Sequence, residues 1–466
     1  MTDTSTDALI TTISAELRGL AVVSGGTELS RENLFIRARD RAVVLAERVA
    51  PDFRVGLVDT RDDESIITLV ACLLAGRSIA MLGVREVDAA ASDLARRARC
   101  SVIAVGGELR DNDDVDGEQA SPLAGLDAGR SPEAVLLFTS GTTGQPKGVR
   151  LSRANVLANL VAMLRTTEEW GPDDRLGQVL TISHSFGLSM VLMALSRATP
   201  IVMLPDGAPS RALSEPLEAH GVTAFACVPY FLRLMARRHI TVGEGAARGI
   251  RHLYLAGGGL ADDEIDQLMP DFDGSLYLMY GFTETAARAA VRRHGDGAPS
   301  GSVGLPLPGT HVDIVTEAGN VVAGGGEGLI RATSPSIMIG YLGDEPRVLG
   351  EPFTTSDLGR LDDAGNLFIT GRDVEMMNFR GNRISVVRVE AQAMQVDGVM
   401  DARAIPDSRD EDAQCLVRVV LAEGADLSAV RKALVAAIDP RGIIRAVEEV
   451  DSLPKTRSGK AIRYGG

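Results

Sequence analysis

The sequence predicts an α/β protein: a large N-terminal domain of mixed sheets layered with helices plus a β region, and a small α+β C-terminal domain. The first observation is that short apolar runs alternate with longer amphipathic ones over residues 53–107, and again from residue 134 past residue 279. This alternation is typical of a parallel or mixed sheet covered by helices. In the first stretch we expect strands at residues 53–59, 78–83 and 101–106 and helices at residues 62–75 and 87–98.

The second and third observations concern the last third of the chain. Glycine-rich apolar segments separated by turns predict a β region, and after Arg372 the pattern changes to a compact α+β tail. The expected strands of the β region are residues 312–316, 328–332 and 367–370. The expected elements of the tail are helices at 387–394 and 427–438 and strands at 402–405 and 416–421. We therefore place a boundary near residues 371–375 and expect domains at 1–372 and 373–466.

Composition excludes several classes of partner. The formal net charge of -15 argues against nucleic acid and against an anionic membrane surface. No basic segment followed by an apolar stretch opens the chain, and the longest apolar run is too short to span a bilayer. The four cysteines are scattered, which indicates reduced structural thiols. We expect a cytoplasmic protein without membrane insertion, and a homodimer stays an open alternative.

A loop rich in Gly, Ser and Thr carries the strongest chemical signal. The apolar run 134–138 leads into Thr139-Ser140-Gly141-Thr142-Thr143-Gly144-Gln145-Pro146-Lys147-Gly148. Glycines let several backbone N–H groups approach one anion, hydroxyls add donors, and the lysine adds positive charge. Ser152 then stands where it would cap a helix. The pattern predicts a phosphate-binding loop that differs from the Walker motif, since Pro146 stands where that motif needs glycine.

Five motifs in order resemble those of the adenylate-forming superfamily, which includes acyl- and aryl-CoA synthetases, peptide-synthetase adenylation domains and luciferases. The chain is most similar to the acyl-CoA synthetase-like members. The motifs are FTSGTTGQPKGV at 138–149, YGFTET at 280–285, TSDLG at 355–359, Gly371-Arg372 with RGNRI at 380–384, and LPKTRSGK at 453–460. In this family the last two motifs belong to the junction and the closing loop of a mobile C-terminal domain.

The resemblance implies ATP and Mg²⁺ as ligands and assigns roles to residues. Thr139, Ser140, Gly141, Thr142, Thr143, Gly144 and Lys147 would cradle the β- and γ-phosphates. Thr283 would bind the α-phosphate and Glu284 would hold Mg²⁺, which favours carboxylate and phosphate oxygens. Asp357 and Arg372 would bind the ribose. Tyr280 and Gly281, with Gly258 and Gly259 on the other side, would enclose adenine. Lys460 would bridge the substrate carboxylate and the α-phosphate.

The resemblance also points to an acid site around His184. Further lining positions are Phe186, Val228, Pro229, Tyr230, Gly257 and Ala286. Without the resemblance, a histidine beside apolar residues would be interpreted as a core residue whose hydrogen bonds are made within the protein. These positions are small or apolar, which favours an uncharged fatty, aromatic or polyketide-like acid. No aspartate stands between residues 181 and 190 to pair an α-amino group, so an amino acid is disfavoured. Arg288 could meet a second polar group of the substrate, with a surface position as the alternative.

Some positions depart from the family pattern. Val374, Asn378 and Ser385 stand where the family commonly has charged or polar residues at its hinge, and Arg153 replaces a histidine after the phosphate loop. Gly381, which leaves room for a pantetheine arm, is kept. None of these changes removes a group that adenylation needs.

The sequence therefore predicts an AMP-forming carboxylic acid–CoA ligase, with a small carboxylic acid, ATP, Mg²⁺ and coenzyme A as its ligands. One alternative acceptor is the phosphopantetheine of a separate carrier protein, and another is a non-thiol nucleophile. An alternative of another class is a non-catalytic protein that binds a nucleotide or acyl-AMP.

Overall fold

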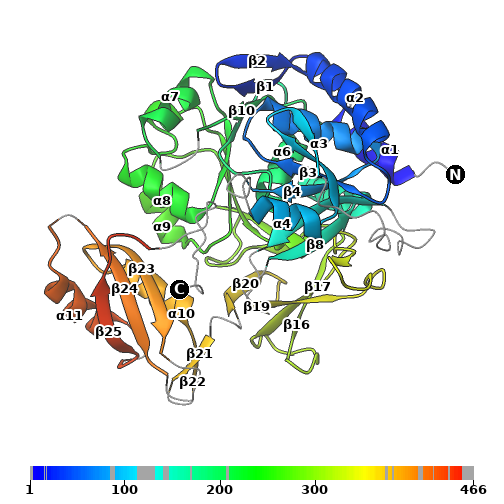
Figure 1. Cartoon of the computed structure of the whole chain (residues 1–466). Helices are drawn as coiled ribbons and strands as arrows, with labels where there is room; N and C mark the ends of the chain where they lie inside the picture. Colours follow the sequence, from blue (N-terminus) through cyan, green and yellow to red (C-terminus); the bar gives the residue numbers. More distant parts are fainter. Residues whose placement is uncertain are drawn as a thin grey trace. The chain divides into compact units, whose positions relative to one another are not determined.

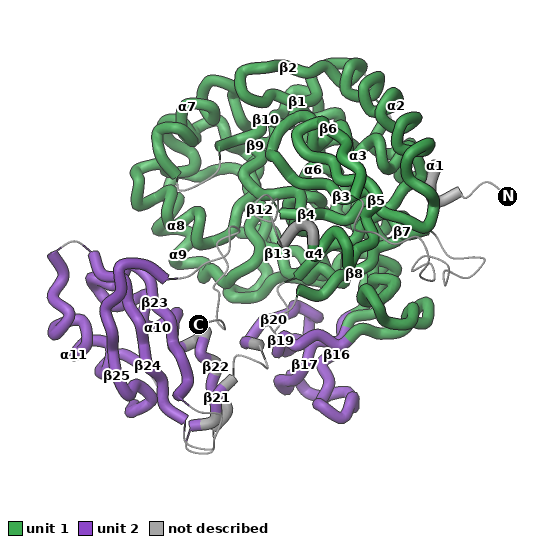
Figure 2. Tube along the Cα trace, in the orientation of Figure 1, with its two compact units in different colours: residues 1–311, 332–353 green, residues 312–331, 354–466 purple. Residues whose placement is uncertain are grey.

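The computed structural model of the chain forms two compact units (Figure 2). Residues 1–311 and 332–353 make up unit 1, and residues 312–331 and 354–466 make up unit 2. The structure describes residues 4–14, 16, 18–83, 90–112, 132–139, 146–167, 170–205, 209–372, 376–379, 382–407, 413–422, 424–438 and 441–453.

Unit 1 contains two large mixed sheets, labelled in Figure 1. The first has the strand order β15 (Leu305–Pro306), β14 (Ala290–Arg293), β13 (Ser275–Tyr280), β12 (His252–Ala256), β11 (Ala224–Cys227), β9 (Leu176–Gln178), β10 (Ile201–Met203), β1 (Leu20–Ser24), β2 (Thr27–Ser30). The strands from β13 to β1 are parallel, and antiparallel strands flank them on both sides. Parallel strands place their carboxyl ends at one edge, where α/β proteins bind ligands.

The second sheet carries the predicted phosphate loop. Its order is β18 (Gly340–Tyr341), β8 (Lys147–Ser152), β7 (Glu133–Thr139), β4 (Ser78–Leu82), β3 (Arg54–Val58), β5 (Cys100–Val105), β6 (Glu108–Asp111). β3 and β4 are buried at every position, as expected for strands covered on both faces. β7 and β8 form an antiparallel hairpin that ends at the loop.

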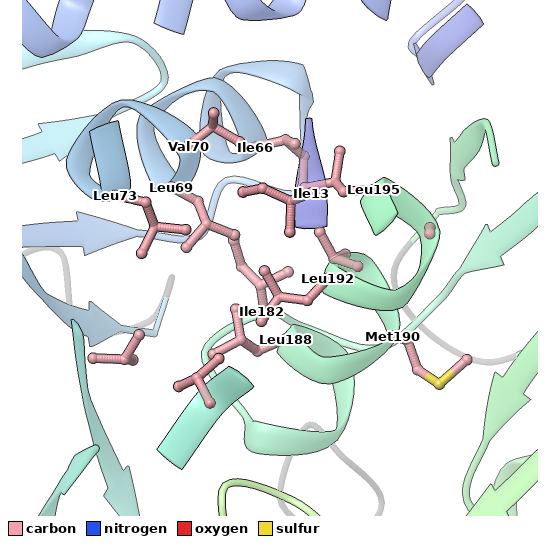
Figure 3. Packing of buried hydrophobic residues seen from close by; sticks show 14 of the residues in the cluster. Ile13, Ile66, Leu69, Val70, Leu73, Ile182, Leu188, Met190, Leu192 and Leu195 are labelled. Carbon is pink, nitrogen blue, oxygen red and sulfur yellow. The ribbon is translucent and has the colours of Figure 1, made fainter. Parts of the chain in front are cut away.

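Helices between the two sheets fill one continuous core. They are α1 (Thr4–Ile13), α2 (Arg31–Arg48), α3 (Asp63–Ala75), α5 (Arg153–Thr166) and α6 (Ser185–Ser196). Figure 3 shows Ile13, Ile66 and Leu69 converging on Leu192 and Leu188. The helix α3 begins at the N-cap Asp62 and ends at Gly76, whose φ of 67° is the left-handed conformation that glycine adopts most readily. This one cluster joins residues of both sheets and of all five helices.

Other helices cover the outer faces of these sheets. The first sheet packs against α7 (Arg211–Ala219), α8 (Pro229–Arg237) and α9 (Asp262–Leu268), and the second against α4 (Ala90–Arg97). Two short 3-10 turns are η2 (Gly245–Ala247) and η3 (Thr283–Thr285). In the described part of the chain, no helix combines the length and apolar composition that a bilayer crossing requires.

Unit 2 contains a β region and an α+β part. The β region is the sheet β16 (His311–Val315), β17 (Gly328–Thr333), β19 (Phe353–Leu361), β20 (Leu367–Arg372). The rest comprises the hairpin β21 (Met376–Phe379) and β22 (Asn382–Ser385), the sheet β23 (Val399–Pro406), β24 (Cys415–Leu421), β25 (Ile444–Glu449), and the helices α10 (Val386–Met394) and α11 (Leu427–Ala437). A hydrophobic cluster of its own stabilises the α+β part.

The predicted fold class is confirmed. The expected strands and helices occur within a few residues of their predicted bounds; α4 is described only from Ala90, and the acidic loop after Asp111 lies largely outside the described residues. The domain boundary at Arg372 stays a prediction: residues 373–375 lie outside the described part, and the compact units group the β region with the tail.

Candidate active site

The hairpin β7–β8 brings the two ends of the phosphate motif together. Thr139 pairs with Lys147 across the hairpin, and Thr139 Oγ1 donates to the carbonyl of Lys147 at 3.4 Å. A Cβ on Gly148 would lie 2.9 Å from Cβ of Leu342, so glycine is needed for β18 to approach β8. Ser140, Gly141, Thr142, Thr143 and Gly144 lie outside the described residues.

Tyr341 connects the lysine of the hairpin to the predicted magnesium ligand. The ammonium of Lys147 lies 5.3 Å from the centroid of the Tyr341 ring, and the Tyr341 hydroxyl donates to Oε1 of Glu284 at 2.7 Å. Burial and the adjacent Glu284 carboxylate raise the pKa of Tyr341, so the phenol stays a donor. The three side chains come from β8, β18 and η3. Sequence reasoning missed Tyr341, because its strand pairs with residues that lie almost two hundred positions earlier.

Glu284 lies in η3 beside Thr283, as a short turn after β13. Its carbonyl accepts from the amide of Met338 at 2.8 Å, which fixes the turn against the segment leading to β18. Among the described residues no group of three or more His, Cys, Asp and Glu side chains is arranged to hold a metal ion. Mg²⁺ is commonly held by one or two carboxylates together with phosphates and water, and the oxygen donors of Glu284 fit that cation.

The residues predicted to enclose adenine lie at the ends of β12 and β13. Ala256 pairs with Met279 in parallel register, which places Gly257 beside Tyr280 at the carboxyl edge of the sheet. Gly257 has a φ of 83°, and Gly257, Gly258 and Gly259 are exposed. A Cβ on Gly281 would lie 1.9 Å from the carbonyl oxygen of Ala287, so this glycine is required for the loop after η3 to close.

The segment with the predicted acid-site histidine is fixed to the second sheet. His184 precedes α6 and is exposed, and its side chain does not cap the helix. The amide of Ile182 donates to Oδ2 of Asp59 at 2.7 Å, after the end of β3. Burial raises the pKa of Asp59, although the amides of Arg61 and Ile182 oppose the shift. Asp59 was not anticipated, because a carboxylate after a strand has no signature of its own.

The other residues predicted to line the acid lie in two places, the start of α8 and the region around the first turn of α6. Val228 and Pro229 begin α8, beside Tyr230, and a Cβ on Gly258 would lie 3.5 Å from Pro229. Phe186 lies in the first turn of α6, and the guanidinium carbon of Arg288 is 4.1 Å from the centroid of its ring. Ala286 lies in the same loop as Arg288, with a φ of 56°.

The surface alternative for Arg288 is wrong, since only 2% of the residue is exposed. The local sequence, two alanines before and two after, gave no sign of that burial. Arg153, which replaces the family histidine, is also buried and donates to the carbonyl of Leu73 at 2.8 Å. That contact ties the start of α5 to α3.

Asn159 of α5 holds the loop that follows η3. Its amide nitrogen donates to the carbonyls of Thr285 at 3.0 Å and Arg288 at 2.8 Å. The helix itself begins directly after β8 with a reciprocal capping box between Ser152 and Asn155, which confirms the predicted cap. Asn159 therefore connects the helix after the phosphate hairpin with the loop between the predicted magnesium ligand and Arg288.

The two predicted ribose ligands are cross-strand partners in unit 2. Asp357 of β19 lies opposite Arg372 of β20 in antiparallel register. Asp357 is 5% exposed, and its amide donates to Oγ1 of Thr355 at 3.0 Å. Lys460, Val374 and Gly381 lie outside the described residues, as do the side chains of Arg372, Asn378 and Ser385.

Residues 15–342 match the family model of AMP-binding enzymes. This match covers well over half of the chain, so the protein belongs to the AMP-binding enzyme family, and the resemblance to the adenylate-forming superfamily is confirmed.

Two curated relatives and one solved structure illustrate the similarity. An L-proline–[L-prolyl-carrier protein] ligase of Streptomyces coelicolor is 29% identical over 356 residues, covering 70% of this chain and 65% of the relative. The 4-coumarate–CoA ligase-like 8 protein of Arabidopsis thaliana is 28% identical over 343 residues, covering 71% and 62%. The matched region thus spans less than two thirds of these relatives. The amide bond synthetase McbA from Marinactinospora thermotolerans has the same fold, with a TM-score of 0.79, 23% identity and 98% of both chains covered.

Proposed function

We propose that this protein is an AMP-forming carboxylic acid–CoA ligase. The observation that carries the proposal is the connection of Lys147, Tyr341 and Glu284: a cation and a carboxylate joined through one phenol. A phosphate site that also binds Mg²⁺ needs both charges at short range. Membership in the AMP-binding enzyme family supports the same interpretation.

In the proposed first half-reaction, a carboxylate oxygen of the acid attacks the α-phosphorus of ATP and pyrophosphate leaves. Both reactants are anions, so the chain must neutralise charge and fix their geometry. Lys147 and the hydroxyls of the loop from Thr139 would bind the β- and γ-phosphates, and Thr283 would donate to the α-phosphate. Glu284 would hold Mg²⁺, which neutralises the phosphate charge.

The adenosine part of ATP would be bound by aromatic, glycine and carboxylate groups. Tyr280 would stack on adenine, with Gly257 to Gly259 close to the other face because they carry no side chains. Asp357 would accept the ribose hydroxyls, and the Asp357–Arg372 register supports a shared role. Lys460, in the C-terminal domain proposed for residues 373–466, would bridge the two reacting anions.

In the proposed second half-reaction, the CoA thiolate attacks the acyl carbonyl, a thioester bond forms and AMP leaves. Carrier-bound phosphopantetheine presents the same thiol chemistry, and one relative is by its name a carrier-protein ligase. The acceptor therefore has to be tested together with the acid.

The test is pyrophosphate release with Mg-ATP and a panel of fatty, aryl, dicarboxylic and amino acids, with and without CoA. We expect release with one class of acid and an acyl-CoA as product. Glu284→Gln should reduce release by about 100-fold, because the variant loses the charge that holds Mg²⁺. Glu218→Gln is the matched control, an exposed glutamate of α7 whose loss should leave the rate unchanged.

Each result has a distinct meaning. Release that stops at acyl-AMP despite CoA would contradict the CoA step and favour a carrier protein or a non-thiol nucleophile. ATP binding by calorimetry without release for any acid would favour a non-catalytic nucleotide-binding protein.

A further inference from the structure

Arg288 differs from other buried arginines of unit 1 in its partners. Arg54 pairs with Glu133 at 2.6 Å, and Arg292 pairs with Asp262 at 3.0 Å. Arg31 has no carboxylate but donates to main-chain carbonyls, including that of Leu195 at 2.9 Å. Among the described residues Arg288 pairs with no carboxylate, and its one main-chain acceptor is the carbonyl of the adjacent Ala287.

The hydrogen bonds of the Arg288 guanidinium are weak ones. Its Nε donates to the sulfur of Met279 at 3.2 Å, and its Nη1 donates to the neighbouring carbonyl of Ala287 at 3.2 Å. Its Nη2 is buried and has no hydrogen-bond partner in the described part of the chain. Burial lowers the pKa of Arg288 to about 9, so the group is still a cation at neutral pH. A buried cation without an anion is unfavourable, which points to a missing partner.

The two residues before Arg288 have backbone dihedral angles that are unfavourable for their residue type. Ala286 and Ala287 have φ values of 56° and 138°, conformations that alanine rarely adopts. Asn159 holds this loop in place by binding the carbonyls on both sides of these alanines, and Gly281 lets the Ala287 carbonyl approach closely. Strain of this kind persists only where surrounding contacts enforce it, and it concentrates at functional sites.

Arg288 contacts one of the residues predicted to line the acid site. The guanidinium stacks on Phe186, two residues after His184, and Ala286 is in the same loop. The guanidinium that carries the unpaired nitrogen therefore lies against Phe186, which was predicted to line the acid.

We propose that Arg288 binds a second carboxylate, so that the acid substrate is a dicarboxylic acid of which one carboxylate is adenylated and the other pairs with Arg288. This inference rests on the proposed function. The planar guanidinium matches a carboxylate in a two-point geometry, which an uncharged acid cannot use. The sequence favoured an uncharged acid because the expected lining positions are small or apolar. The structure adds a buried arginine in contact with one of those positions, Phe186, and we therefore propose a charged acid instead.

The test compares matched acids on the full chain: butanoate with succinate, hexanoate with adipate, and benzoate with terephthalate. We expect the wild type to have a kcat/KM at least about 100-fold higher for the preferred diacid than for its monoacid, as for other buried charged pairs. Arg288→Met should lose about that factor for the diacid and keep or improve activity with the monoacid. Arg288→Lys should have a kcat/KM for the diacid between those of the wild type and Arg288→Met. Arg293→Met, an exposed arginine of β14, is the matched control.

A melting curve separates a binding role from a structural one. Arg288→Met removes a buried, unpaired charge with little change in volume, so its melting temperature without ligand should equal or exceed that of the wild type. A clear fall in melting temperature, with equal losses for both acids of each pair, would overturn the proposal.

Calorimetry with the same acids distinguishes this proposal from the ligase proposal. Wild-type enzyme that releases pyrophosphate with monoacids as readily as with diacids would refute the role of Arg288 and leave the ligase intact. If no acid gives release, diacid binding that Arg288→Met abolishes would uphold the Arg288 site and refute the ligase. Absence of such binding would refute both.

Discussion

The hydroxyl of Tyr341 offers the sharpest single-atom test of the candidate site. Tyr341→Phe removes the donor to Glu284 and keeps the ring beside Lys147. The cation–ring contact should therefore persist in the variant. What changes is the support for the carboxylate that we propose as the magnesium ligand.

The size of the effect follows from the contact. A hydrogen bond to a charged group contributes about 1.5–3 kcal/mol. The O–O distance of 2.7 Å is typical of a charge-assisted bond, whereas the partial exposure of Tyr341 favours the lower end of that range. About 1.5 kcal/mol corresponds to roughly a tenfold loss in kcat/KM for Mg-ATP.

The assay is pyrophosphate release at several Mg²⁺ concentrations. We expect Tyr341→Phe to need more Mg²⁺ for half-maximal rate, because the unsupported carboxylate holds the ion less well. Tyr277→Phe, which removes a phenol from the core of β13, is the control. A kcat/KM for Tyr341→Phe within twofold of wild type, with an unchanged Mg²⁺ dependence, would refute the reasoning.

Three further predictions concern other parts of the chain. Glu133→Gln should lower the free energy of unfolding by about 3–5 kcal/mol in urea titrations, because Arg54 and Arg150 lose a buried carboxylate. Burial alone would raise the pKa of Glu133, but Arg54, then Arg150 and Ser78, lower it below the usual value. The stability that this carboxylate contributes in the wild type is therefore present above about pH 4.3, the usual pKa of glutamate, and is lost as the pH falls through the folded-state pKa. The variant should lack this dependence on pH. Asn159→Ala should lower the free energy of unfolding by about 2 kcal/mol and raise the KM for the acid, because two buried carbonyls lose their donor. A KM equal to that of the wild type would contradict the role of α5 in placing the loop. Lys460→Ala should abolish turnover while calorimetry still detects ATP, whereas Lys432→Ala on the exposed face of α11 should change neither.

Much of the fold could be predicted because apolar runs mark fully buried strands. β3, β4 and β7 each contain an uninterrupted apolar run bounded by polar residues, and a run of that length between turn residues is typical of a strand covered on both faces. β25 escaped prediction because charged residues at Arg445, Glu448 and Glu449 interrupt its apolar positions. The strand exists because β24 provides a parallel partner, which no local pattern reveals.

The candidate site was predictable where motifs are contiguous and unpredictable where distant strands meet. The register of Asp357 with Arg372 agrees with two motif residues expected at one ligand. Tyr341 and Asn159 were missed because their roles depend on tertiary contacts with Glu284 and the loop after η3. Burial of Arg288 likewise depends on Phe186, about a hundred residues earlier in the chain.

The four thiols have a practical consequence for labelling. Cys72, Cys100, Cys227 and Cys415 are all buried and free, and burial raises the pKa of each. The thiolate is the species that reacts with maleimides, so the native protein should be nearly inert to them at neutral pH. One cysteine introduced on the exposed face of α11 and another on the exposed face of α7 would then accept a dye pair without removal of native residues. Fluorescence transfer between the dyes would report directly whether the C-terminal part rotates during turnover.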